Sequence, residues 1–111
     1  MADGQAEAVV VSPGDVVTSL RGRDRGTVAM VWGLLGRDRV AIVDGDVHPI
    51  ARPKAKNRRH LRLIGHAAEM AHRMATGTAM SDGDISSALE PWRQGTAQTA
   101  GEEGSGDAKG G

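Results

Sequence analysis

Five short apolar segments, mostly divided by turns that contain glycine, restrict this chain to a narrow set of folds. Each has the length of a short strand, and together they cover residues 16–20, 27–32, 40–43, 47–50 and 60–64. In the second segment, Val28, Met30 and Trp32 alternate with the residues of an opposite face. Short strands separated by such turns are typical of a small antiparallel barrel or sandwich. The sequence therefore predicts a mainly β fold.

A different pattern follows the last of these segments and predicts two short helices. Residues 66–75 carry alanine and methionine at helical spacing, and Gly77 stands where the helix would end. Ser81 and Asp84 match a capping box, and we expect Pro91 to end the second helix. Because neither helix is long enough to be stable alone, both should pack on the β domain or on each other.

The length of 111 residues allows one small domain. Residues 1–9 are mostly small or polar, and residues 93–111 are rich in glycine, so we expect a disordered N-terminal extension and a disordered tail. Between them we expect a barrel over residues 10–65 and a helical appendage over residues 66–92.

The net charge of zero conceals an uneven distribution of charge along the chain. Residues 21–73 carry twelve basic and five acidic side chains, whereas both ends are acidic. The densest basic stretch is residues 52–62, with six bases and no acid. Bases can also protect a sheet edge, but six exceed what that protection requires. The pattern predicts contact with nucleic acid.

A second basic segment lies in the turn between the first two expected strands. Arg21, Arg23 and Arg25 project from it, and their guanidinium groups are suited to bidentate contact with phosphate. The alternative is a solvated turn in which Asp24 pairs locally with an arginine. Four glycines are expected to shape this turn and others, namely Gly14, Gly22, Gly26 and Gly45.

The glycine and charge pattern of residues 14–28 resembles the KOW motif. Four blocks in order, residues 19–26, 43–46, 52–61 and 81–89, are similar to the small bacterial KOW-domain RNA-binding proteins. Those proteins are in turn similar to large-subunit ribosomal KOW proteins of eukaryotic and archaeal type. The resemblance covers about residues 12–90, and it implies an SH3-like barrel that binds RNA. The chain departs from the pattern in its two extensions and in using arginine where such proteins more often carry lysine.

The expected partner is therefore RNA, with ribosomal RNA and the ribosome as the favoured case. The candidate RNA-binding residues are Arg21, Arg23, Arg25, Arg52, Lys54, Lys56, Asn57, Arg58, Arg59, His60 and Arg62. Trp32 and Trp92 are the sole aromatic residues apart from histidine, which leaves few rings for base stacking. We therefore expect recognition of phosphates and shape. The alternative is a protein-interaction module whose bases attract an acidic transcription or translation partner.

No feature of the sequence favours an enzyme. His66 and His72 are six residues apart, which places them on different faces of a helix and argues against a metal site. Asp44 and Asp46 are expected to form a turn rather than an acid–base pair. The chain contains no cysteine and no apolar run long enough for a membrane span. We expect no cofactor, metal or small-molecule substrate, and a cytoplasmic protein without membrane contact.

Overall fold

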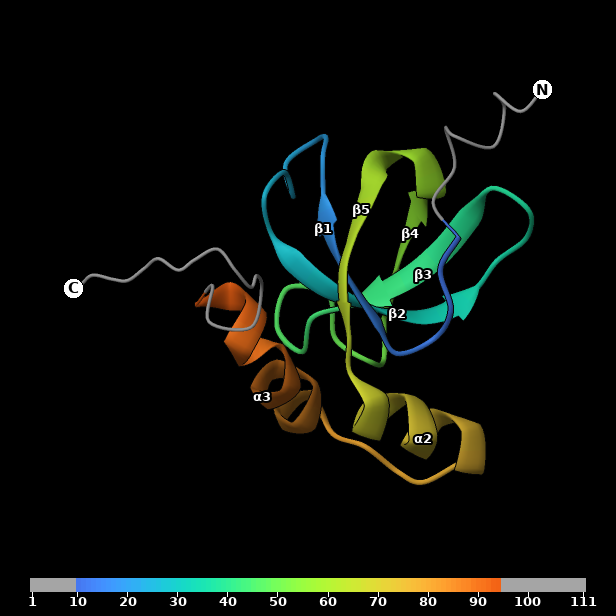
Figure 1. Ribbon diagram of the computed structural model, residues 1–111, viewed down its shortest axis with the longest axis vertical. Helices are drawn as coiled ribbons and strands as arrows, with labels where there is room; N and C mark the ends of the chain where they lie inside the picture. Colours follow the sequence, from blue (N-terminus) through green and yellow to red (C-terminus); the bar gives the residue numbers. More distant parts are fainter. Residues whose placement is uncertain (1–9, 95–111) are drawn as a thin grey trace.

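The computed structural model describes residues 10–94, which form a five-stranded antiparallel sheet followed by two helices (Figure 1). Along the chain these are β1 (Asp15–Ser19), β2 (Val28–Leu34), β3 (Arg39–Val43), β4 (Lys54–Asn57), the 3₁₀ helix η1 (Arg58–His60), β5 (Leu61–His66), α2 (Ala68–Thr76) and α3 (Asp82–Arg93). The strand order is β4-β3-β2-β1-β5, so β4 and β5 are edges and the sheet is not closed. The expected mainly β fold with two C-terminal helices is confirmed. The expected disordered ends lie outside the described residues, except for Arg93 and Gln94.

One face of the sheet encloses an apolar core. Its buried side chains come from β1, β2, β3, β5 and the residues before β1, and they are Val11, Val17, Ala29, Val31, Val40, Ile42 and Leu61. Because side chains from four strands meet in one cluster, the sheet curves around them in the manner of a half-open barrel.

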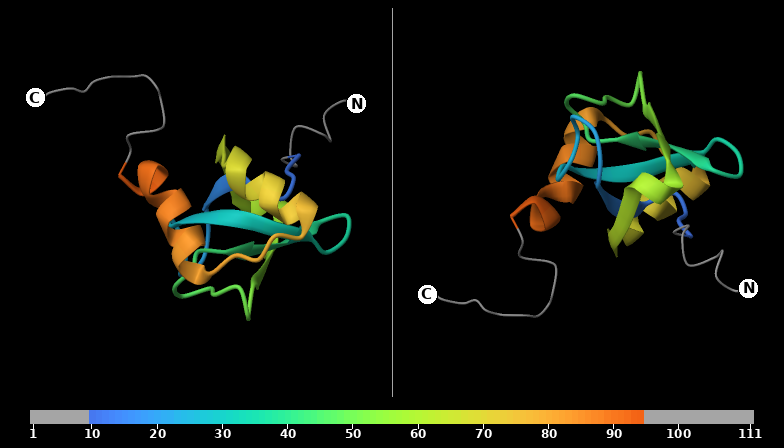
Figure 2. Two further views of the ribbon diagram at one scale, coloured as in Figure 1. Left: turned by 90° about the horizontal axis from the view of Figure 1, so that it is seen from below. Right: turned by 90° about the horizontal axis from the view of Figure 1, so that it is seen from above.

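The opposite face of the same strands is also buried, against the helices. Val16, Met30 and Val43 point to this side, where they pack with Met70 of α2 and with Ile85 and Leu89 of α3. In both views of Figure 2, α3 lies against β2. The helices thus cover a sheet face and complete a second core.

The helices approach the strands closely at two of the predicted turn glycines. A Cβ atom on Gly14, whose φ is +94°, would lie 2.4 Å from the Cβ of Ala71 in α2. A Cβ atom on Gly45, whose φ is +80°, would lie 2.4 Å from the carbonyl oxygen of Asp82 in α3. Both positions therefore require glycine. Gly22 and Gly26 also have positive φ, as expected.

The strand predicted at residues 47–50 is wrong, because this segment is part of the loop between β3 and β4. Two of its backbone amides donate to side chains: that of His48 to Asp44 Oδ1 at 2.8 Å, and that of Ile50 to Asp82 Oδ1 at 2.7 Å. Pro49 has no amide hydrogen to donate. The fourth strand is instead the basic segment Lys54–Asn57, which pairs with β3.

The two helices begin and end close to their predicted signals. α2 starts at Ala68 rather than residue 66, since His66 is still in β5, where its Nδ1 lies 2.6 Å from Asp15 Oδ1. Gly77 ends α2 in the left-handed conformation. Ser81 caps α3, and its capping box with Asp84 is formed in both directions. The predicted caps are confirmed.

The expectation that Pro91 ends the second helix is wrong. α3 continues through Trp92 to Arg93, so the tail predicted from residue 93 starts too early. Tertiary contacts hold this last turn: the Trp92 ring lies so close to Gly65 that a Cβ there would be 2.3 Å from its Nε1. Arg93 donates to the carbonyl of Asp44 at 2.9 Å. A proline so near the helix end interrupts few backbone bonds, and these contacts outweigh that loss.

No helix within residues 10–94 combines the length and apolar character that a membrane crossing needs.

Candidate functional site

The loop between β1 and β2, residues 20–27, is a compact turn held by its own backbone. The amide of Gly26 donates to the carbonyl of Ser19 at 2.8 Å, and the amide of Arg25 donates to that of Gly22 at 3.1 Å. The amide of Thr27 donates to the carbonyl of Asp24 at 2.8 Å. The three arginines predicted to contact RNA here are exposed and extend from this ordered backbone.

Asp24 joins this loop to β4 and pairs with no neighbouring arginine, so the local pair that the alternative for this turn assumed is not formed. Its Oδ2 lies 3.2 Å from Lys56 Nζ, and its Oδ1 lies 3.3 Å from His48 Nε2. Partial burial by itself raises the pKa of the Asp24 carboxyl group. Hydrogen bonds and charge from Lys56 and His48 outweigh burial and hold that pKa below its ordinary value.

A second contact brings the loop to η1. The amide of Leu20 donates to the carbonyl of His60 at 2.8 Å. Asn57 caps η1, because its Oδ1 accepts from the amide of Arg59 at 2.9 Å. The loop and η1 both lie at the end of the sheet away from α2 (Figure 1). Two basic segments that are far apart in sequence therefore meet.

Arg58 fixes the loop between β2 and β3. Its guanidinium donates to the carbonyl of Arg37, and its amide donates to the carbonyl of Asp38 at 2.8 Å. Its Nε is buried without a hydrogen-bond partner. Among the predicted RNA-binding residues, Lys56, Asn57 and Arg58 are therefore engaged within the fold, and His60 is half-buried.

The remaining predicted bases are exposed, and none belongs to an ion pair between described residues. Sequence analysis missed Arg37 and Arg39, which are exposed in the same way and lie next to η1, with Arg39 opposite Asn57 in the sheet register. The Arg-Asp-Arg pattern that they share with residues 23–25 could have found them. We call the following nine residues the basic surface: Arg21, Arg23, Arg25, Arg37, Arg39, Arg52, Lys54, Arg59 and Arg62.

The helices carry the opposite charge balance. Four acidic residues lie on them, namely Glu69, Asp82, Asp84 and Glu90. Their two arginines are both paired: Arg73 lies 3.0 Å from Glu69 and 3.5 Å from Asp84, and Arg93 lies 3.4 Å from Glu90. Charge is thus separated between the sheet, with its loops, and the helical layer.

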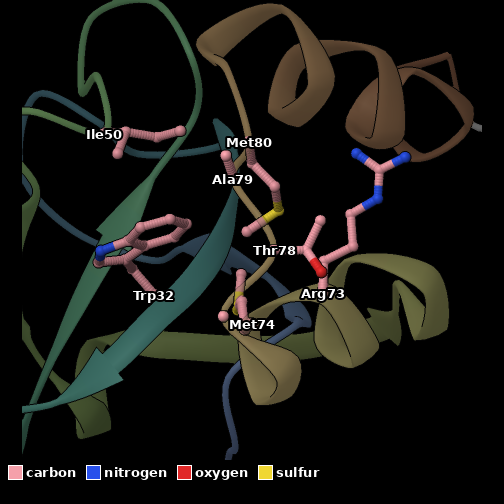
Figure 3. A pocket seen from close by; sticks show the side chains of 8 residues that line it. Trp32, Ile50, Arg73, Met74, Thr78, Ala79 and Met80 are labelled. Atoms are coloured by element: carbon pink, nitrogen blue, oxygen red, sulfur yellow. The ribbon is translucent and has the colours of Figure 1, made fainter.

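An apolar cavity of about 490 Å³ lies on the helix side of the sheet. Trp32 of β2 and Met74 of α2 face it, together with Ile50 and Met80 (Figure 3). It contains none of the residues predicted to bind RNA. Trp32 is half-buried here, in the core-facing position that the strand pattern indicates.

Two further features considered in the sequence are the Asp44–Asp46 turn and a metal site formed by histidines. Asp44 is buried, and its Oδ1 accepts from the amides of Asp46 and His48 at 2.8 Å each, as expected of a turn residue. Within residues 10–94, no group of three histidine or acidic side chains is placed to hold a metal ion.

Comparison with known proteins gives no match: no protein-family model matches the chain, and no curated protein is similar to it at a significant level. The KOW resemblance therefore stays a prediction.

Proposed function

We propose that this protein binds structured RNA and is associated with the ribosome, contacting RNA phosphates through the basic surface. The observation that carries the proposal is that nine exposed bases lie on residues 52–62 and on the two loops and the start of β3 that contact this segment. None of them is neutralised by an acid within the described residues. Eight of the nine are arginines, whose planar groups suit bidentate contact with phosphate.

The position of the two tryptophans supports recognition by phosphate and shape. Trp32 and Trp92 both pack against the helix-side core, away from the basic surface. Single-stranded RNA is usually held by stacking bases on exposed rings, whereas a folded RNA presents closely spaced phosphates. A rigid, arginine-rich surface suits the second kind of target. The resemblance to ribosomal KOW proteins favours ribosomal RNA, and with it a cytoplasmic location.

The alternative is a protein-interaction module in which the same surface attracts an acidic partner from transcription or translation. Both hypotheses predict salt-sensitive binding, so salt dependence alone does not distinguish them. Affinity for purified RNA does distinguish them, because only the RNA-binding hypothesis predicts it.

The test measures filter binding of a ribosomal RNA fragment over a series of salt concentrations. Contact with about six phosphates predicts a log–log slope of roughly −4 to −5. Arg59→Glu should weaken binding at every salt concentration and reduce the slope by about 1. Arg59 is chosen over Arg58 because its side chain is exposed and belongs to no ion pair among the described residues, whereas Arg58 donates to the carbonyl of Arg37.

The matched control adds the same change of charge on the helices, as Ala68→Glu with Ser87→Glu, both at exposed positions. It should retain most of the affinity. Absence of RNA binding at low salt contradicts the proposal, as does an equal loss of affinity in both variants. Sedimentation of the native protein with large ribosomal subunits tests the ribosomal part of the proposal.

A further inference from the structure

A cleft of about 580 Å³ opens beside the basic surface, between the β1–β2 loop, the β3–β4 loop and β4. Two members of that surface, Arg23 and Lys54, line it. Its volume falls in the range of about 300–1,000 Å³ typical of small-ligand pockets. A surface that contacts phosphates alone has no need of such a hollow, because phosphates project from the nucleic acid.

Three of the residues that line this cleft are joined through Asp24. Asp24 lies between Lys56 and His48, and the three side chains are 20%, 12% and 15% exposed. The negative charge of Asp24 is thereby matched by Lys56. Asp44, which also lines the cleft, has one carboxylate oxygen occupied by two backbone amides. This part of the lining is therefore polar and held in place by these contacts. Three basic side chains of the lining, Arg23, Lys54 and Lys56, outnumber its two acids, Asp24 and Asp44, so the cleft keeps a net positive charge.

The rim combines the two cations with an apolar side chain. Val47 lines the cleft and is 70% exposed. The amides of the residues on both sides of it, Asp46 and His48, donate to the carboxylate of Asp44, and these bonds hold the backbone of Val47 in place. Cations beside an apolar surface and an imidazole ring match the parts of a nucleotide, which has a charged phosphate and a flat base.

We infer that this cleft holds one unpaired nucleotide of the bound RNA, with its phosphate contacted by Arg23 and Lys54 and its base lying against Val47 and His48. A base inside an A-form helix is stacked and cannot enter a cleft, so the nucleotide comes from a bulge or a loop. The inference rests on the proposed function and narrows its ligand to structured RNA that contains an extruded nucleotide.

The experiment compares two short RNA hairpins that differ by a single bulged adenosine, using fluorescence anisotropy at one low salt concentration. The native protein should bind the bulged hairpin about fivefold or more tightly than the continuous one. Val47→Asn removes the apolar part of the cleft at an exposed position and should bring this ratio close to one. Val10→Asn is the matched control, because Val10 is 82% exposed and does not line the cleft, and it should keep the ratio.

Each outcome bears on a separate claim. Equal binding of the two hairpins overturns the inference and leaves the proposed function intact. A preference for the bulge that survives in Val47→Asn also overturns it, since the nucleotide then binds elsewhere. If neither hairpin binds at low salt, the proposed function fails together with the inference that rests on it.

Discussion

The carboxylate of Asp24 lies 3.2 Å from the ammonium group of Lys56, and this contact joins the β1–β2 loop to the edge strand β4. Both side chains are largely buried. Lys56 thus joins the β1–β2 loop to β4, whereas Lys54 and Arg59 of the same basic segment remain exposed.

Replacing Asp24 with asparagine should lower the free energy of unfolding at neutral pH by about 1 kcal/mol, because the charge-assisted contacts with Lys56 and His48 are weakened. Urea denaturation measures the difference. Asp38→Asn is the control, since this exposed carboxylate has no ion-pair partner among the described residues, and it should change stability by less than about 0.5 kcal/mol.

The same variant should also lose part of the acid sensitivity. The pKa of Asp24 is lower in the folded protein than its ordinary value of 3.8, so the unfolded chain binds this proton more readily. The stability that Asp24 contributes is therefore complete above about pH 4 and is lost as the pH falls through the folded pKa. The stability curves of native protein and Asp24→Asn should converge below about pH 4. Parallel curves over the whole range would contradict this prediction.

Gly14→Ala should destabilise the protein by about 2 kcal/mol or more, because the added Cβ atom meets Ala71 of α2 at 2.4 Å and the backbone has positive φ. Gly26→Ala separates the two effects. Its φ is +85° but nothing lies within 4 Å of the added atom, so it should cost about 1 kcal/mol. Thermal or urea unfolding measures both variants, and equal losses would show that the contact with α2 has no energetic weight.

Ser81→Ala removes the side chain that accepts from the amide of Asp84 at 3.1 Å. We expect a loss of about 1 kcal/mol from the cap. Ser87→Ala, at an exposed position within the same helix, should be neutral or slightly stabilising, because alanine favours helix. Helical circular dichroism during unfolding reports both, and a loss as large in Ser87→Ala would argue against the cap.

Substitution of Arg58 should mainly affect stability, whereas substitution of the adjacent Arg59 should mainly affect RNA binding. Arg58→Ala should lower stability by about 1–2 kcal/mol, since it releases the carbonyl of Arg37 and the β2–β3 loop. Arg59→Ala should leave stability within about 0.5 kcal/mol of the native protein but weaken RNA binding. Urea unfolding and filter binding, measured on the same preparations, test these separate roles. If both variants lost stability and RNA affinity to the same extent, the prediction would be wrong.

The sequence predicts the parts of this fold whose signals are local. Alternation marks β2, the capping box marks the start of α3, and Gly77 marks the end of α2. The errors arise where distant residues decide. The loop at residues 47–50 is held by Asp44 and Asp82, and the helix runs past Pro91 because Trp92 and Arg93 contact other segments.

The candidate site, too, is predictable only where its signal is local. Charge density along the chain is sufficient to identify both basic segments. The sequence does not reveal which bases are engaged in the fold, because Lys56 finds its partner 32 positions away, at Asp24. The Arg-Asp-Arg pattern marks Arg37 and Arg39 as candidates, but only the fold shows that they lie beside η1.

Burial on both faces of the central strands has a consequence for how the chain finds its pairing. When one face of a sheet is exposed to solvent, a shift of the strand register by one residue moves the apolar side chains to that face and is strongly disfavoured. Here Val16 and Val17, or Met30 and Val31, are equally buried on opposite sides, so such a shift would exchange one apolar side chain for another. Alignment of the strands must therefore come from the turns. The same ordered loops that present the arginines therefore also help to set the register of the strands.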